Sequence, residues 1–392
     1  MSSKVRTGLD RFDKIWPKSL KTANIGLLVH PASINSRYIH STELFFKTKK
    51  CRLSALFGPQ HGIKGETQDN MIEWEGSRDP ANGLPVYSLY GKSRKPTPEV
   101  LINIDAMVID MQDVGTRYYT FIWTMALVME ACQEHNKAVV VLDRPNPIGG
   151  DMIEGPVLQP EFASFVGLRS LPVRHGMTIA EIALYIKNIY YPAVDLHIIG
   201  MEGWERHMWF DDIGLPWAMP SPNMPTLETA TVYPGMCLLE ATNLSEGRGT
   251  TRPFEIFGAP FIDPDILMKR LKEFKLKGAI FRPLHFLPTF QKHAGKICGG
   301  AQIHVTERNM FKPFKTAAAI LKSIKELYPK DFSWNKPPYE YEGKLPPIDI
   351  LAGTDRFRRD IEAGIDLDKM ETWWKNDTEE FNRKIRSKHL LY

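Results

Sequence analysis

The sequence is poor in cysteine and has no closely spaced cysteines. Its four cysteines are Cys51, Cys132, Cys237 and Cys298, and no two of them form a CxxC pair. Zinc sites built on cysteine and disulfide-rich scaffolds both use closely spaced cysteines, so the sequence argues against both classes. Because three of the four lie in apolar runs, we expect buried free thiols, as in a reducing compartment.

Long hydrophobic runs and a strong excess of one charge are also missing. The 50 basic and 46 acidic residues give a formal net charge of +4, with no basic stripe that would favour nucleic acid as a partner. No window approaches the roughly eighteen apolar residues of a membrane span. The first residues, MSSKVRTGLDRF, lack the apolar core of a signal peptide. We therefore expect a cytoplasmic protein, or an exported one with a processed N-terminus.

Several catalytic and cofactor motifs are absent. There is no GxSxG nucleophile motif and no HExxH metal motif. The dinucleotide fingerprint GxGxxG is missing as well, because the chain reads HPASINS after its first apolar run. We therefore expect no nucleotide cofactor and no metal, although His61, Asp110 and Asp113 could in principle converge on a metal ion.

What the sequence does contain is a regular alternation of apolar runs and helical patterns. Apolar runs at 24–30, 51–57, 106–110, 138–143 and 194–200 predict buried strands, and patterns at 37–49, 121–135 and 178–190 predict helices. Strands that are apolar on both faces and alternate with helices indicate a parallel sheet covered on both sides. The predicted fold class is therefore α/β, with a Rossmann-like N-terminal domain.

A second, smaller α/β domain is predicted from the C-terminal part. The proline-rich segment 214–234 has the composition of a crossing between domains, so we predict domains at 1–230 and 231–392 with a cleft between them. The second domain should contain strands at 236–242, 278–286 and 297–306 and helices at 263–275 and 313–328.

Polar loops follow the predicted strands. In the first domain they lie at 58–91, 111–121 and 143–156, and a fourth, 243–260, follows the first strand of the second domain. In parallel sheets ligands bind outside the carboxyl ends of the strands, so these loops are expected to form a site. The first loop is rich in acids and amides and carries Trp74, a composition suited to a carbohydrate, since acids and amides bond hydroxyl groups and indole stacks on a sugar. The alternative is a structural loop ordered by its own polar groups.

The candidate site residues come from these loops. Glycoside hydrolysis usually uses two carboxyl groups, one as a proton donor and one as a base or nucleophile. The catalytic candidates are Glu66, Asp69 and Glu246. The substrate-binding candidates are Gln60, His61, Arg117, Tyr118, Arg144, Asn146 and Arg248. The arginines could clamp a substrate carboxylate with two parallel donors, or they could instead pair with neighbouring acids to order the loops.

Several long motifs resemble one family. The runs FGPQHGIKGE, NGLPVYSLYG, DVGTRYYTFIWTM, LDRPNPIGG, EGPVL, SFVGLRSLPVRHGMT and EATNLSEGRGTTRPFEIFGAP are similar to the exo-β-N-acetylmuramidase (NamZ) family, in the family's order. This resemblance implies a Rossmann-like domain, a smaller α/β domain and a cleft between them. It also implies a glycosidase without cofactor that removes N-acetylmuramic acid from the non-reducing end of peptidoglycan fragments.

One residue departs from the family pattern. The resemblance implies a catalytic glutamate in a PEHG motif, and this chain has Gln60 at that position. An amide cannot donate a proton as a carboxylic acid does, so Glu66 or Asp69 would have to supply the acid. Three interpretations stay open: a muramidase, a sugar-binding relative without turnover, and a hydrolase of another acidic sugar.

Overall fold

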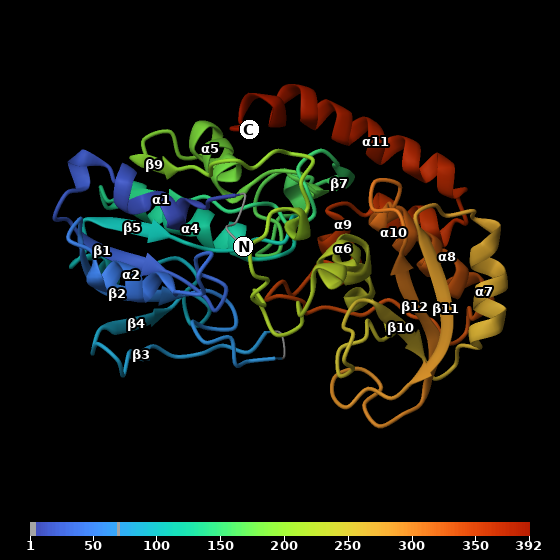
Figure 1. Ribbon diagram of the computed structural model, residues 1–392. Helices are drawn as coiled ribbons and strands as arrows, with labels where there is room; N and C mark the ends of the chain where they lie inside the picture. The colour runs from blue at the N-terminus through green and yellow to red at the C-terminus, as the bar shows by residue number, and fades with distance from the viewer. Residues whose placement is uncertain (1–4, 69–70) are drawn as a thin grey trace.

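The N-terminal half of the molecule is built on a mixed sheet. The computed structural model describes residues 5–68 and 71–392. The sheet has seven strands in the order β3-β4-β2-β1-β5-β6-β9 (Figure 1). They are β1 (Asn24–Leu28), β2 (Arg52–Gly58), β3 (Ser77–Arg78), β4 (Pro85–Ser88), β5 (Ala106–Ile109), β6 (Ala138–Leu142) and β9 (Leu196–Ile199). β3 runs antiparallel to β4, and the other pairings are parallel. The predicted α/β class with a Rossmann-like sheet is confirmed.

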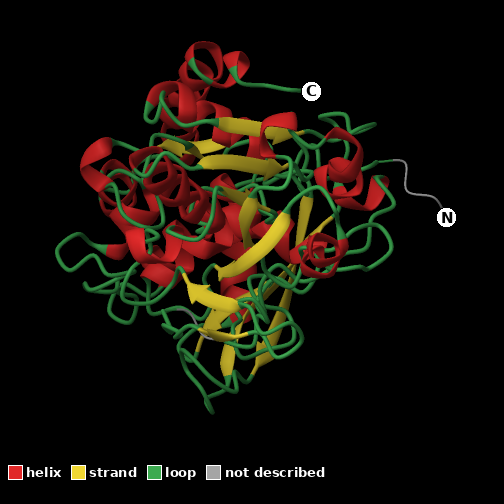
Figure 2. Cartoon of the chain, turned by 90° about the vertical axis from the view of Figure 1, so that its left-hand side faces the viewer, coloured by secondary structure: helices red, strands yellow, loops and turns green. Residues whose placement is uncertain are grey.

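Helices cover both faces of this sheet, as Figure 2 shows. They are α1 (Gly8–Ile15), α2 (Ser41–Lys47), α3 (Pro98–Leu101), α4 (Phe121–Glu134) and α5 (Ile179–Ile189). Phe12 of α1 and Phe45 of α2 pack with Val140 in one buried cluster. Trp123 of α4 and Val139 belong to the other cluster. Because side chains alternate along a strand, Val139 and Val140 face opposite layers. Strands buried on both sides account for their continuous apolar runs.

The C-terminal half is the smaller α/β unit, on the right in Figure 1. Its antiparallel sheet has the order β10-β12-β11. Its elements are β10 (Ile256–Ala259), α7 (Pro264–Glu273), β11 (Ala279–Phe286), β12 (Cys298–Val305), α8 (Pro313–Leu327), α9 (Pro347–Ala352), α10 (Arg356–Glu362) and α11 (Leu367–Lys384). The helix and strand positions predicted at 263–328 agree with these bounds. α11 returns along the top of the molecule and packs on β7 (Glu154–Val157) of the N-terminal half.

The strand predicted at 236–242 is wrong. α6 (Leu227–Met236) runs through this region and continues into the short helix η4 (Cys237–Ala241). Every residue from 229 to 241 is buried, so its apolar run carries no periodicity that separates a buried helix from a buried strand. The boundary predicted at residue 230 falls within α6 and stays our proposal.

The loop predicted after β2 also contains more structure than expected. β4 pairs with β2, and β3 pairs with β4. Both strands are too short to show a period of two in the sequence. The remaining short elements are η1 (Lys18–Leu20), η2 (Pro160–Phe162), β8 (Pro172–Arg174), η3 (Phe210–Asp212) and η5 (Arg386–Lys388).

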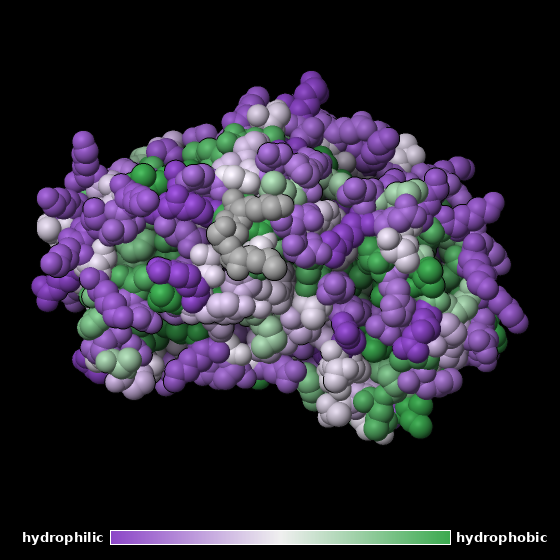
Figure 3. Space-filling view, viewed as in Figure 1, coloured by the Kyte–Doolittle hydropathy of each residue, from purple (hydrophilic) through white to green (hydrophobic). Residues whose placement is uncertain are grey.

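The surface is mainly polar on the face shown in Figure 3, with small separate hydrophobic areas. None of the helices in the described ranges is long and apolar enough to cross a membrane. All four cysteines are buried and free, as predicted.

Candidate functional site

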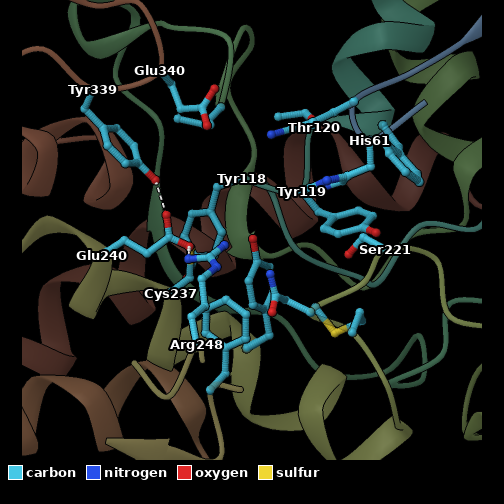
Figure 4. Close-up of a pocket in the computed structure, with 17 residues that line it drawn as sticks. His61, Tyr118, Tyr119, Thr120, Ser221, Cys237, Glu240, Arg248, Tyr339 and Glu340 are labelled. Atoms are coloured by element: carbon cyan, nitrogen blue, oxygen red, sulfur yellow. Dashed lines mark hydrogen bonds and ion pairs between the residues drawn. The ribbon is translucent and has the colours of Figure 1, made fainter. Parts of the chain in front are cut away.

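A small cavity lies where the two halves meet (Figure 4). Its volume is about 50 Å³. Its walls come from the loop after β2, the residues before α4, segment 221–224, the α6–η4 junction and segment 339–340. A wider cavity of about 410 Å³ shares Glu240, Arg248 and Tyr339 with it. Both halves of the chain therefore contribute walls to the small cavity, and three side chains border both cavities.

Four of the predicted substrate-binding residues line the small cavity: Gln60, His61, Tyr118 and Arg248. Glu246 lines the wider cavity instead. Glu66 is exposed and lines neither, and Asp69 lies outside the described residues. The structure thus brings predicted binding residues together without the predicted acid Glu66.

Three other predicted binding residues are Arg117, Arg144 and Asn146, whose polar groups bond to other parts of the protein. The guanidinium of Arg117 is fully buried and donates to three backbone carbonyl oxygens, one of them in α9. Arg144 forms a two-pronged pair with Asp110, at 2.6 and 3.0 Å. Asn146 Oδ1 accepts from the backbone N–H of Ile148 at 3.2 Å within its own turn, and its Nδ2 donates to the Met177 carbonyl oxygen at 3.0 Å. These bonds order the surrounding loops, and none of the three side chains lines the small cavity.

Gln60 belongs to a series of hydrogen bonds that crosses the site. The Thr120 hydroxyl donates to Gln60 Oε1 at 2.7 Å, and Gln60 Nε2 donates to the Tyr90 hydroxyl at 3.2 Å. The Tyr90 hydroxyl in turn donates to Glu340 Oε2 at 3.0 Å. Both ends of the Gln60 amide are therefore engaged, and the series ends at a carboxyl group from the C-terminal half.

Glu240 and Arg248 form a buried pair beside this series. Arg248 Nη1 donates to Glu240 Oε1 at 2.7 Å and to Glu246 Oε1 at 3.2 Å. The other oxygen of Glu240 accepts from the Tyr339 hydroxyl at 2.8 Å, as drawn in Figure 4. The buried Arg248 Nε has no hydrogen-bond partner in the described part of the chain. The N–H of Arg248 Nε is therefore a cationic donor to which a ligand oxygen can bond.

The two carboxyl groups next to this pair differ in their affinity for protons. Burial alone would raise the pKa of Glu246, but the charges of Lys292 and Arg248 outweigh it and lower that pKa. Burial raises the pKa of Glu340 from 4.5 to about 7, and the negative charge of Glu240 adds to this. Glu340 is therefore protonated in a large part of the population near neutral pH.

The raised pKa of Glu340 predicts a pH-dependent stability. Glu240 acts in the same direction as burial, whereas the Tyr90 hydrogen bond and the charges of Arg94 and Arg248 oppose it. A carboxyl group whose pKa is higher in the folded state stabilises fully below the unfolded pKa, and this contribution is lost as the pH rises through the folded value. Relative to Glu340→Gln, the wild-type free energy of unfolding should fall by about 3 kcal/mol between pH 4.5 and pH 7.5. Urea unfolding across this range measures it, and parallel curves for the two proteins would contradict it.

Sequence reasoning did not select Tyr90, Glu240, Tyr339 and Glu340 for the site. Two of them lie in the family motifs: Tyr90 in NGLPVYSLYG and Glu240 at the start of EATNLSEGRGTTRPFEIFGAP. Glu240 was also visible as an isolated carboxylate within the apolar run MCLLEA. Tyr339 and Glu340 lie in a segment without a motif and reach the site only through the fold.

Two family models match consecutive parts of the chain. One family model, described as exo-β-N-acetylmuramidase NamZ, N-terminal, matches residues 25–228, and its C-terminal counterpart matches residues 231–392. The chain belongs to the NamZ family. The family predicted from the motifs is therefore confirmed, and both NamZ parts are present.

Similar proteins cover the same length. A Bacillus subtilis (strain 168) protein named peptidoglycan β-N-acetylmuramidase NamZ is 45% identical over 389 residues, which is 99% of this chain and 92% of that protein. Two crystal structures of DUF1343 family proteins from Bacteroides fragilis have TM-scores of 0.90 and 0.78 to this structure. Their identities are 32% and 27%, and each comparison covers 99% of both chains. The NamZ fold thus extends over the whole chain.

Proposed function

We propose that this protein is an exo-acting β-N-acetylmuramidase that releases N-acetylmuramic acid from the non-reducing end of peptidoglycan fragments. The observation that carries the proposal is the match of both NamZ parts, together with 45% identity to a peptidoglycan β-N-acetylmuramidase over 99% of the chain. The site supports it, because glycoside hydrolysis needs carboxyl groups in a sheltered cavity and Glu240 and Glu340 line one.

Arg248 offers a binding group for an anionic sugar. Muramic acid carries a lactyl carboxylate that glucosamine lacks, and Arg248 lines the small cavity with an Nε that has no hydrogen-bond partner in the described part of the chain. A charge-assisted hydrogen bond of this kind contributes about 1.5–3 kcal/mol.

The direct test is the release of 4-nitrophenol from two synthetic glycosides. The protein should hydrolyse 4-nitrophenyl β-N-acetylmuramide and should prefer it to the N-acetylglucosaminide by about ten-fold or more, in line with one charge-assisted hydrogen bond. Uronide glycosides test the alternative of another acidic sugar. Hydrolysis of the uronide in preference to the muramide would contradict the proposal.

Gln60 favours a second candidate, a relative that binds the sugar without turning it over. In that case calorimetry would show binding of N-acetylmuramic acid while no 4-nitrophenol is released. Gln60→Glu would then create activity in a protein that has none. We also propose a cytoplasmic location, since the four cysteines are free and buried; fractionation of cells tests this.

A further inference from the structure

A tight turn in the C-terminal half presents Glu340 to the site. Tyr339 and Glu342 exchange two backbone hydrogen bonds, each of 2.9 Å, around Glu340 and Tyr341. The two central residues have φ values of +44° and +69°. This left-handed conformation is unfavourable for any residue with a Cβ atom, and such turns normally use glycine or asparagine. Backbone strain of this kind persists where the surroundings hold it, often at functional sites.

The surroundings hold both central side chains of this turn. Glu340 points inward, where it is buried and accepts the Tyr90 hydrogen bond (Figure 4 shows its carboxyl group at the cavity). Tyr341 points outward, with the guanidinium of Arg94 3.6 Å from its ring centre. Tyr90 and Arg94 both belong to the N-terminal half. The strained turn therefore fixes one carboxyl group of the C-terminal half against the N-terminal wall of the cavity.

The N-terminal side of the small cavity has Gln60 and, among the described residues, no carboxylic acid. An amide has no proton to give to a leaving group, and both of its ends are bonded, to Thr120 and Tyr90. Glu240 is unsuited as a donor because its two oxygens accept from Arg248 and Tyr339. Glu246 is held as a carboxylate by Arg248 and Lys292.

We infer that Glu340 is the general acid of this glycosidase, in place of the glutamate that Gln60 replaces. The inference rests on the proposed function. It is supported by the inward turn, by the burial of the carboxyl group and by the Tyr90 bond, which holds one oxygen and leaves the acid aimed at the cavity. The raised pKa agrees with this role, since a general acid works best when its pKa lies near the operating pH.

Hydrolysis of the glycosidic bond with Glu340 as the acid conserves atoms and charge. The Glu340 carboxyl group gives its proton to the glycosidic oxygen as the bond from that oxygen to C1 breaks, and the electron pair of the bond goes to the oxygen. Water then supplies a hydroxyl group to C1, and its remaining proton goes to the Glu340 carboxylate. The products are free N-acetylmuramic acid and the shortened fragment, and the acid is restored.

Two substrates with different leaving groups test this role. One is the disaccharide with N-acetylmuramic acid linked to N-acetylglucosamine, whose sugar hydroxyl must be protonated to leave. The other is 4-nitrophenyl β-N-acetylmuramide, whose nitrophenolate leaves without a proton. Glu340→Gln should lower kcat/KM for the disaccharide by about 10²–10⁴-fold and for the nitrophenyl glycoside by a much smaller factor. The loss of disaccharide activity above about pH 7 in the wild type should disappear in the variant.

Glu342→Gln is the matched control, because Glu342 lies on the same turn and accepts from the backbone N–H of Lys344. Its activity on both substrates should match the wild type, and calorimetry with N-acetylmuramic acid should show that both variants still bind sugar. Suppose that the wild type is active. If Glu340→Gln is equally active, or if its kcat/KM falls by the same factor for both substrates, the inference is wrong while the proposed function stands. If the wild type hydrolyses neither substrate, the proposed function fails and the inference with it.

Discussion

Replacing Arg248 by methionine should destabilise the fold and remove the preference for muramic acid. Arg248 is the one cation shared by Glu240 and Glu246, and its side chain is only 9% exposed. Removing one partner of a buried ion pair leaves a charge without compensation and costs about 3–5 kcal/mol. Methionine keeps much of the side-chain volume that packs on Phe254. The decrease in the free energy of unfolding should therefore come mainly from removing the positive charge. Urea unfolding measures the first effect, and the ratio of kcat/KM for the two nitrophenyl glycosides measures the second.

Arg252→Met is the matched control in the same loop. Arg252 pairs with Glu255 at 3.3 Å, but its side chain is 46% exposed, so this variant should lose no more than about 1 kcal/mol. Arg248→Lys should keep part of the stability and of the preference, because the charge survives without the fork of donors. Equal stability of the two methionine variants would show that Arg248 does not balance the buried acids. An unchanged substrate ratio in Arg248→Met would assign the lactyl carboxylate to other groups.

Gly235→Ala should disrupt the wall that carries Glu240. Gly235 lies in α6, and an added Cβ atom would overlap the backbone carbonyl oxygen of Pro313 at the start of α8 and lie 3.2 Å from Ala317 Cβ. Overpacking of this kind costs about 1–3 kcal/mol, and here a backbone atom must move. α6 would have to shift, and it continues directly into η4 with Glu240. We expect a lower urea midpoint and a loss of activity together.

Gly343→Ala separates this effect from the general cost of replacing glycine. Gly343 has ordinary backbone angles, and an added Cβ atom would meet nothing within 4 Å. The stability and activity of the Gly343→Ala variant should stay at the wild-type level. If Gly235→Ala behaved like Gly343→Ala, the contact between α6 and α8 would not be the close approach that the structure describes.

The fold was largely predictable because parallel strands buried on both faces leave continuous apolar runs. The runs at 24–30 and 138–143 and the capping box of Thr178 and Glu181 all correspond to elements of the structure. Segment 236–242 was not predictable in the same way. Burial on all sides removes the periodicity that would have identified α6, and Pro234 within it argues against a helix from sequence alone.

The site was predictable in its loops but less so in its side chains. The loops after β2 and β5 do reach the cavity, because the ends of parallel strands share one edge of the sheet. Within these loops, however, the sequence does not show which way a side chain points. Arg117 turns into the protein while its neighbour Tyr118 lines the cavity. Glu340 comes from a segment with no motif, brought in by the packing of the C-terminal half.

The series from Thr120 through Gln60 and Tyr90 to Glu340 bears on how relatives are sorted into enzymes and pseudoenzymes. Tyr90 and Glu340 are 250 positions apart in the chain, yet they share a hydrogen bond. Because the family resemblance implies a catalytic glutamate at position 60, a survey that scores only the residue after Pro59 would place this protein among the pseudoenzymes. The informative unit is the combination of residues at positions 60 and 340, because both side chains line the same cavity and both bond to the Tyr90 hydroxyl. Relatives are therefore better grouped by the pair, and a chain that lacks both carboxyl groups is the stronger candidate for lost catalysis.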